Sequence, residues 1–310
     1  MTFSHLLNLW DDFWFKPQPP TAMALFRIAY GLIVLQFGLL LHPNLTAFFG
    51  EGAIVSLPSA RMFAGAPQLN VLLLLPQNDS ALQVFFAVFM AASVFLTLGL
   101  MSRLSAAIVF LAFVSLDFRD PFVFNSGDNF LRLGAFYLML SHAGAAFSLD
   151  SAIKRALGQG DHPPVYAPWA QRLLQVQLVL IYCDTFWTKI VSEQWIDGTA
   201  VYYALRLQEF ERLPVPHLLG SVVASKVLSW TTLLLELAGW TLIWVRDLRY
   251  PVLGALALFH LCLDWTLNIP QFQWIMLASM IAWIEPADIA AVGQQLSSRL
   301  RHRSGGVTEV

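Results

Sequence analysis

Long apolar runs recur along this chain, and they constrain its fold more than any other feature. Eight runs are long enough, or nearly so, to cross the hydrocarbon core of a bilayer, which takes about 20 residues of helix. Only 12% of the residues are charged, against about 25% in a soluble chain. The sequence predicts an all-α, polytopic membrane helix bundle with about eight transmembrane helices. The predicted spans are residues 21–41, 81–99, 104–118, 130–149, 170–190, 226–245, 251–268 and 270–285.

The connections between these runs alternate in charge, which gives an orientation. Loops on one side are short and basic, whereas those on the other side are longer and carry most of the acids. Basic loops stay in the cytoplasm, so we expect both termini to be cytoplasmic in a multi-pass protein of the cell's inner (plasma) membrane. The long connections 42–80, 117–129 and 190–225 then face outward, where loops held by a rigid scaffold tend to carry function.

The chain divides into three parts. Residues 1–20 are aromatic and amphipathic, which predicts an interfacial helix, because Trp favours the headgroup level. Residues 21–285 form the transmembrane domain. Residues 286–310 are polar, and we expect a disordered cytoplasmic tail. Within the connection 42–80, the run VLLLL is too short to span and predicts a half-buried or re-entrant piece.

Several classes of function lack support. A net charge of −2 argues against a nucleic-acid partner. The two cysteines, Cys183 and Cys262, are not in a metal-ligand spacing, so no metal site is predicted. Motifs for nucleophilic hydrolysis and for nucleotide binding are missing. The start has no basic region leading into a clean apolar run, so we expect no cleavable signal peptide. Repeat halves, which would favour a transporter, are also missing.

The fifth run carries ionisable groups where they are expensive. A charge inside hydrocarbon costs several kcal/mol unless it is paired or hydrated, yet Asp184 and Lys189 both lie here. Tyr182, Thr185 and Lys189 share one helix face, and Asp184 lies on an adjacent face. Lys189 has two interpretations. It anchors the helix end by reaching the interface, or it is a desolvated lysine that can act as a base.

Two other runs add ionisable groups. His260, Asp264 and Asn268 form one stripe on the seventh run. This stripe either joins helices through hydrogen bonds or presents a histidine, oriented by a carboxylate, to a polar cavity. Glu236 lies in the middle of the sixth run and needs a partner, for which Lys189, His260 and a backbone group are all candidates.

The segment between the third and fourth runs is rich in charges and turn formers. Asp128 is expected to cap the following helix. Arg119 and Arg132 either hold an anionic group or pair with the local acids. Arg27 is a further charge, inside the first run.

Six segments stand out, in order, along the chain. They are ALFRIAYGLIVL (24–35), FFGEGAI (48–54), residues 99–136 with SLDFRDPFVFNSGDNFLR, IYCDTFWTKI to YYAL (181–205), LLLELAGWTLIW (233–244) and FHLCLDWTLNIPQFQWIMLA (259–278). Each segment alone is short, and together they cover roughly residues 20–285. In this order they resemble the HTTM family, which includes the membrane part of vitamin K-dependent γ-carboxylase and many bacterial relatives.

The resemblance implies a chemistry. The carboxylase lysine regarded as the base that deprotonates vitamin K hydroquinone corresponds to Lys189. A family histidine corresponds to His260, and a family acid within the membrane corresponds to Glu236. The active site of the family lies on the lumenal side. The carboxylase also has a large lumenal domain that holds its protein substrate. We expect this chain to be a small bacterial member without that domain, so glutamate carboxylation is not expected.

We therefore expect Lys189, His260, Glu236 and Asp264 to be catalytic, on a quinone, lipid or peptide that approaches from outside the cytoplasm. Vitamin K hydroquinone is the type of cofactor that the resemblance implies, and membrane lipid and a peptide or protein substrate are the expected partners. The alternative is a non-catalytic membrane partner in the maturation, export or protection of a peptide or of another membrane protein. The residues expected to bind a cofactor are Tyr182, Arg119, Asn129 and Trp195.

Overall fold

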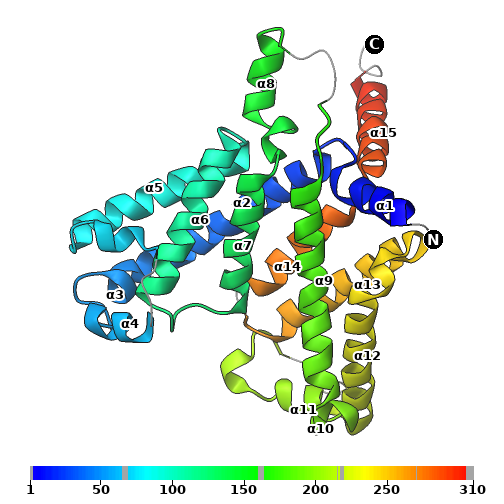
Figure 1. Cartoon of the computed structure of the whole chain (residues 1–310). Helices are drawn as coiled ribbons and strands as arrows, with labels where there is room; N and C mark the ends of the chain where they lie inside the picture. The colour runs from blue at the N-terminus through cyan, green and yellow to red at the C-terminus, as the bar shows by residue number, and fades with distance from the viewer. Residues whose placement is uncertain are drawn as a thin grey trace, which may run out of the picture.

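The computed structural model describes residues 3–64, 69–159, 164–214, 216, 220–269 and 271–304. Within them the chain is helical and has no strands beyond isolated bridges, which confirms the all-α prediction (Figure 1). The α-helices are α1 (Phe3–Phe15), α2 (Thr21–Leu41), α3 (Leu45–Phe49), α4 (Leu57–Ala64), α5 (Asp79–Leu98), α6 (Ser102–Arg119), α7 (Ser126–Leu140), α8 (Leu149–Ala156), α9 (Trp169–Ile190), α10 (Glu193–Ile196), α11 (Ala200–Ala204), α12 (Val222–Trp240), α13 (Arg246–Thr266), α14 (Phe272–Met280) and α15 (Pro286–Ser304).

Membrane-spanning character is clearest in three stretches of the described residues. Thr21–Phe49, which begins with α2, is long and apolar enough to cross a bilayer, and so are α5 and α12. The pair Phe272–Trp283 and Pro286–Arg299 adds a fourth if it counts as one span bent by 95°. The fold is therefore that of a membrane protein, with fewer clear spans than the eight that the sequence predicts.

The predicted run 130–149 is divided in the structure. Helix α7 ends at Leu140, and a 3₁₀ turn follows at Ala143–Ala145. The Ser141 hydroxyl accepts the Ala143 N–H at 3.2 Å and so replaces a helical hydrogen bond at that point. The helix is therefore shorter than the apolar run that encodes it.

Contacts between segments far apart in the sequence tie the bundle together. Backbone bridges pair Gln18 with Tyr166 and Glu211 with Leu267, and Arg249 binds Glu285 at 2.9 Å. Figure 1 shows α8 and α15 at the top of the view, α3 and α4 at its left and α10 and α11 at its bottom.

Helices α2, α5, α6 and α7 pack around a core rich in aromatic rings. Phe26, Tyr30, Phe89 and Phe113 are all at most 1% exposed. Gly31 permits the close approach of α2 to α5, because a Cβ there would lie 2.9 Å from the Thr97 Cα. Close packing of this kind gives a rigid half of the bundle.

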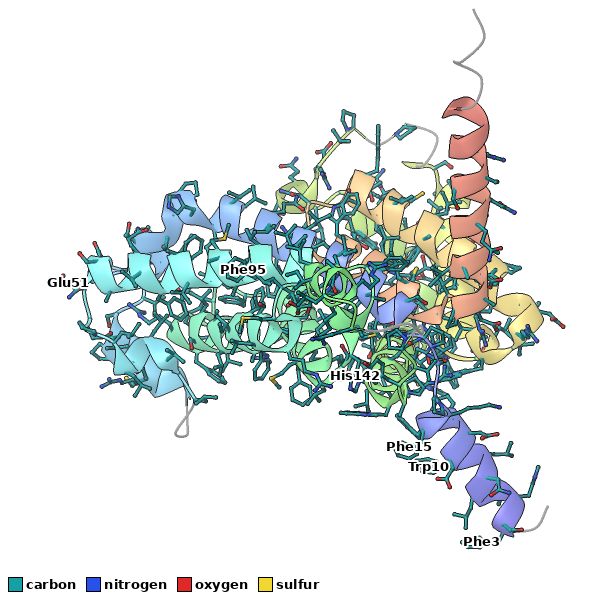
Figure 2. All side chains as sticks on the ribbon, turned by 90° about the horizontal axis from the view of Figure 1, so that it is seen from above. Phe3, Trp10, Phe15, Glu51, Phe95 and His142 are labelled. Atoms are coloured by element: carbon teal, nitrogen blue, oxygen red, sulfur yellow. The ribbon has the colours of Figure 1, made fainter. Side chains whose placement is uncertain are left out.

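The predicted N-terminal helix is present as α1. It projects from the body of the fold, with Phe3, Trp10 and Phe15 along it (Figure 2). These side chains are 77%, 59% and 52% exposed, so α1 presents a large apolar surface, as an interfacial helix would.

The connection 42–80 contains α3, α4 and a 3₁₀ helix, Val71–Leu74, formed by the VLLLL run. Leu72 is buried, whereas Leu74 is 81% exposed, so this run is half-buried, as predicted.

The C-terminal region corrects an expectation. We expected a disordered tail from 286, but α15 is helical over Pro286–Ser304. Proline suits the first turn of a helix, and Asp288 in that turn accepts a hydrogen bond from the Tyr250 hydroxyl. Residues 305–310 lie outside the described residues.

Candidate functional site

Lys189 and Glu236 form an ion pair between α9 and α12. The Lys189 ammonium donates to Glu236 Oε1. The glutamate side chain is 5% exposed and the lysine side chain 22%. Lys189 therefore turns toward a buried carboxylate in a neighbouring helix. Lys189 is one of the three candidate partners that the sequence offers for Glu236.

Glu236 is also incompletely paired. Its other oxygen, Oε2, is buried and has no hydrogen-bond partner within the described part of the chain. The Thr185 side chain lies near the carboxylate, but its hydroxyl donates to the carbonyls of Ile181 and Tyr182. A buried oxygen left without a donor is costly, which makes Oε2 available to a proton or to a ligand hydroxyl.

A second set of polar groups lies beside this pair. The Tyr182 hydroxyl and His260 Nε2 are 2.8 Å apart, and His260 Nδ1 is 2.5 Å from Gln273 Oε1. Tyr182, His260 and Gln273 are all at most 2% exposed. Tyr182 is also within electrostatic range of Glu236. We call Lys189, Glu236, Tyr182, His260 and Gln273 the polar cluster; it joins α9, α12, α13 and α14.

The close contact of α9 with α12 depends on a glycine. A Cβ at Gly239 would lie 2.9 Å from the Tyr182 ring, so a larger residue would push the helices apart. Fourteen residues of α12 precede Glu236, which is roughly 21 Å of helix at 1.5 Å per residue. The ion pair therefore lies inside the bundle and not at its rim.

The segment after α9 covers the lysine. Trp195 of α10 places its ring centroid 5.1 Å from the Lys189 ammonium, a distance at which a cation is attracted to the ring face. The turn that follows is fixed by Gly198, which has a φ of +80° and packs against Lys226. The hydroxyls of Ser225 and Ser229 both donate to the Gly198 carbonyl and hold the turn on α12.

Asp197, at the same turn, is a carboxylate outside the spans. The Thr199 hydroxyl and amide donate to it at 2.7 and 2.9 Å and hold the pKa of its carboxyl below the usual range, and Lys226 contributes in the same direction. The turn is therefore stabilised by an ionised acid.

Asp264 does not join His260. It binds Arg212 at 2.5 Å, and Gln273 takes the place beside the histidine that we expected a carboxylate to occupy. The two residues share a stripe of α13, but Asp264 lies in the last turns, where a loop residue reaches it.

Arg119 and Asn129 lie away from the polar cluster. Arg119 is 5% exposed and donates to the carbonyls of Val55 and Gly50, so it holds the loop between α3 and α4. Asn129 accepts a hydrogen bond from Arg132, which also pairs with Asp117. Of the four expected cofactor-binding residues, only Tyr182 and Trp195 adjoin Lys189.

Gln273 was missed by sequence reasoning. The available signal was a buried amide in an otherwise apolar helix, QFQWIMLA. Such an amide needs a polar partner inside the bundle. No cluster of three or more metal-ligating side chains occurs among the described residues.

Two cavities lie elsewhere on the bundle. One, of about 370 Å³, lies at the loop between α3 and α4, beside Arg119, Gly52 and Pro76. The other, of about 430 Å³, is a groove between α2 and α14 that is lined by Leu32 and Trp274 among others. Neither of the two is lined by Lys189, Glu236 or His260.

Comparison with known proteins gives one match. The family model of the HTTM domain matches residues 15–287. Searches of curated proteins and of solved structures return no match. The family match covers nearly all of the chain, including every residue of the polar cluster. The chain therefore belongs to the HTTM domain family.

Proposed function

We propose that this protein is a multi-pass protein of the inner membrane, with eight crossing segments and both termini in the cytoplasm. The charge alternation of the loops supports this orientation. Helices α6, α7, α9, α13 and α14 pack against the candidate spans α2, α5 and α12, which favours a common membrane depth. The polar cluster then lies toward the extracytoplasmic half.

Within this orientation, we propose an enzyme that removes a proton from a hydroxyl of a quinol or related lipid. The observation that carries this proposal is the ion pair of the half-buried Lys189 with the buried Glu236, whose second carboxylate oxygen has no partner among the described residues. A peptide or other substrate approaches from the extracytoplasmic side, as the resemblance to the carboxylase implies.

The pair supplies a base without changing its net charge. Transfer of the shared proton from the Lys189 ammonium to Glu236 leaves a neutral amine beside a neutral acid, a state that a low dielectric favours over two separated charges. The Lys189 amine then accepts the proton of a bound hydroxyl. An oxyanion forms next to the lysine ammonium, and Glu236 retains the proton it received.

The side chains around the pair are of the kinds that contact an aromatic ring carrying a hydroxyl. Trp195 offers a ring face over Lys189, and the unpaired Glu236 Oε2 offers an acceptor for a hydroxyl. A quinol would supply the acidic hydroxyl, and its later oxidation would be chemistry of the quinol itself. Tyr182, held by His260, fixes the wall of the site beside Glu236.

The experiment is extraction of the purified protein for bound quinones and lipids, followed by mass spectrometry. We expect a quinone-type molecule or lipid to accompany the wild type and to be reduced at least about tenfold in Lys189→Ala, which is about 1.4 kcal/mol. Lys226→Ala, which changes a lysine near the same loop but outside the pair, is the control and retains the ligand. Equal occupancy in Lys189→Ala would contradict the proposal.

A second candidate function is a non-catalytic membrane partner for a peptide or another membrane protein. The bonding of Asp264 to Arg212 and of Arg119 to loop carbonyls favours it, because these predicted site residues shape the outer loops. If this candidate is right, Lys189→Ala leaves the maturation, export or protection of the partner unchanged, whereas Arg119→Ala abolishes it.

A further inference from the structure

One face of α9 points away from the rest of the fold. Leu180, Trp187 and Val191 are 54%, 56% and 77% exposed, and Asp184 and Thr188 are exposed beside them. The spacing from 180 to 191 is i, i+4, i+7, i+8 and i+11, so these five side chains form one continuous stripe. We call it the Asp184 stripe.

Among the residues that the structure describes, the Asp184 carboxylate is unpaired. No ion pair or side-chain hydrogen bond joins it to another residue in the described ranges. Lys189, the nearest lysine along the helix, points to a different face and is engaged by Glu236. The acid that stands out in the sequence is therefore not part of the polar cluster.

Asp184 also lies well inside α9. Fifteen residues of α9, roughly 22 Å of helix, precede it, and six residues, roughly 9 Å, follow it before the helix ends at Ile190. On its other faces α9 packs against the candidate span α12, with the Phe186 and Trp240 ring centroids 6.4 Å apart. In the membrane orientation proposed above, a carboxylate at this position on the outside of the bundle meets hydrocarbon.

We propose that the Asp184 stripe is a docking surface for a single transmembrane helix of another protein, and that this helix carries a lysine or arginine in the hydrocarbon region, opposite Asp184. Charge complementarity selects this occupant. An isolated acid inside a membrane helix is costly, and a cation on a partner helix would pair with the carboxylate and reduce that cost. Leu180 and Trp187 supply the apolar contact, and the Thr188 hydroxyl, one turn from Asp184, can bond the same cation.

The test uses the full-length protein in phosphatidylcholine vesicles with dye-labelled Leu/Ala peptides of about 24 residues, long enough to span. One peptide carries a single Lys at its centre, a second carries Leu there, and a third carries its Lys at one end. Energy transfer from the protein's tryptophans to the dye reports binding. We expect the central-Lys peptide to bind about tenfold more tightly than either of the others.

Two variants identify the residue. Asp184→Asn removes the preference for the central-Lys peptide, whereas Asp197→Asn, which changes an exposed acid in the neighbouring loop, keeps it. Asp184→Lys prefers a peptide with a central Asp. Equal binding of the three peptides to the wild type, or an unchanged preference in Asp184→Asn, would overturn the proposal. So would self-association of the wild type that Asp184→Asn abolishes, because the occupant would then be a second copy of this chain. The outcome is independent of ligand occupancy at Lys189.

Discussion

The two halves of the bundle bury charge in different ways. The half built from α2, α5, α6 and α7 buries two arginines, with Arg27 at 0% and Arg119 at 5% exposure, and the helix-capping Asp128. The half built from α9, α12, α13 and α14 buries Glu236 and His260 and places the half-buried Lys189 against Glu236. An arginine does not lose its proton in a protein, whereas the groups of the second half can exchange protons with one another.

The hydrogen-bond partners of these charged groups also differ between the two halves. Arg27 donates to the Phe147 carbonyl at 2.5 Å and Arg119 to the Val55 carbonyl at 2.9 Å, so each fastens a connection to a helix. Lys189 binds a carboxylate that keeps one free oxygen. The buried arginines are thus fixed cross-links in one half, whereas Lys189 and Glu236 of the other half form a pair that can exchange a proton. This difference separates the residues expected to stabilise the fold from those expected to act on a ligand.

The largest effect is expected at Arg27. Arg27→Met removes the hydrogen bonds to Phe147 and Ser102 and leaves their acceptors inside the bundle. At about 1.5–3 kcal/mol for each bond to a charged group, we expect a loss of roughly 3–6 kcal/mol. Thermal unfolding in detergent micelles measures it. Arg155→Ala, at an exposed arginine of α8, should leave the unfolding midpoint unchanged. If the unfolding midpoint of Arg27→Met were also unchanged, the distinction between the halves would be lost.

A smaller effect is expected at the histidine. Tyr182→Phe and Gln273→Leu each leave one ring nitrogen of His260 without its buried partner, and each should cost about 1–3 kcal/mol. Because both act on the same imidazole, the double variant should cost less than the sum. Unfolding midpoints of the four proteins give the coupling. Strict additivity would show that the three side chains do not act as one unit.

The smallest effect on stability is expected at the turn of Asp197, Gly198 and Thr199, and this effect depends on pH. The pKa of Asp197 is held low by Thr199, so the stabilisation is present above the unfolded pKa, about 3.9, and is lost as the pH falls through the folded value. Hydrogen exchange at the Thr199 amide should accelerate relative to neighbouring amides only below about pH 4. Thr199→Ala should move that onset to higher pH. An onset near neutral pH would show that another group controls the turn.

Sequence patterns predicted much of this architecture and part of the site. Apolar runs located the helices, and the expense of an acid in a membrane helix pointed to a partner for Glu236, with Lys189 among the candidates. Periodicity shows which residues share a helix face, but not which neighbouring helix that face meets. For this reason Asp264 was assigned to His260 although it binds Arg212, and Gln273 was missed.

The positions of the helix ends could not be predicted from the hydrophobic pattern either. The apolar run continues past Leu140, but a local hydrogen bond of Ser141 ends α7 there. In the polar C-terminal segment the low hydrophobicity predicted disorder, whereas Asp288 and Tyr250 bind the first turn of α15 to the bundle. Such side-chain bonds are decided by tertiary neighbours.

The most direct test of the contrast between the halves is the double variant Lys189→Met/Glu236→Leu. Replacing a whole buried ion pair by apolar residues of similar volume is often neutral for stability, whereas removing one partner costs about 3–5 kcal/mol. We predict that the double variant unfolds within a few degrees of the wild type, that each single variant is clearly destabilised, and that bound quinone or lipid is lost from the double variant. A double variant that is stable and still retains the wild-type ligand would contradict the assignment of this pair to chemistry.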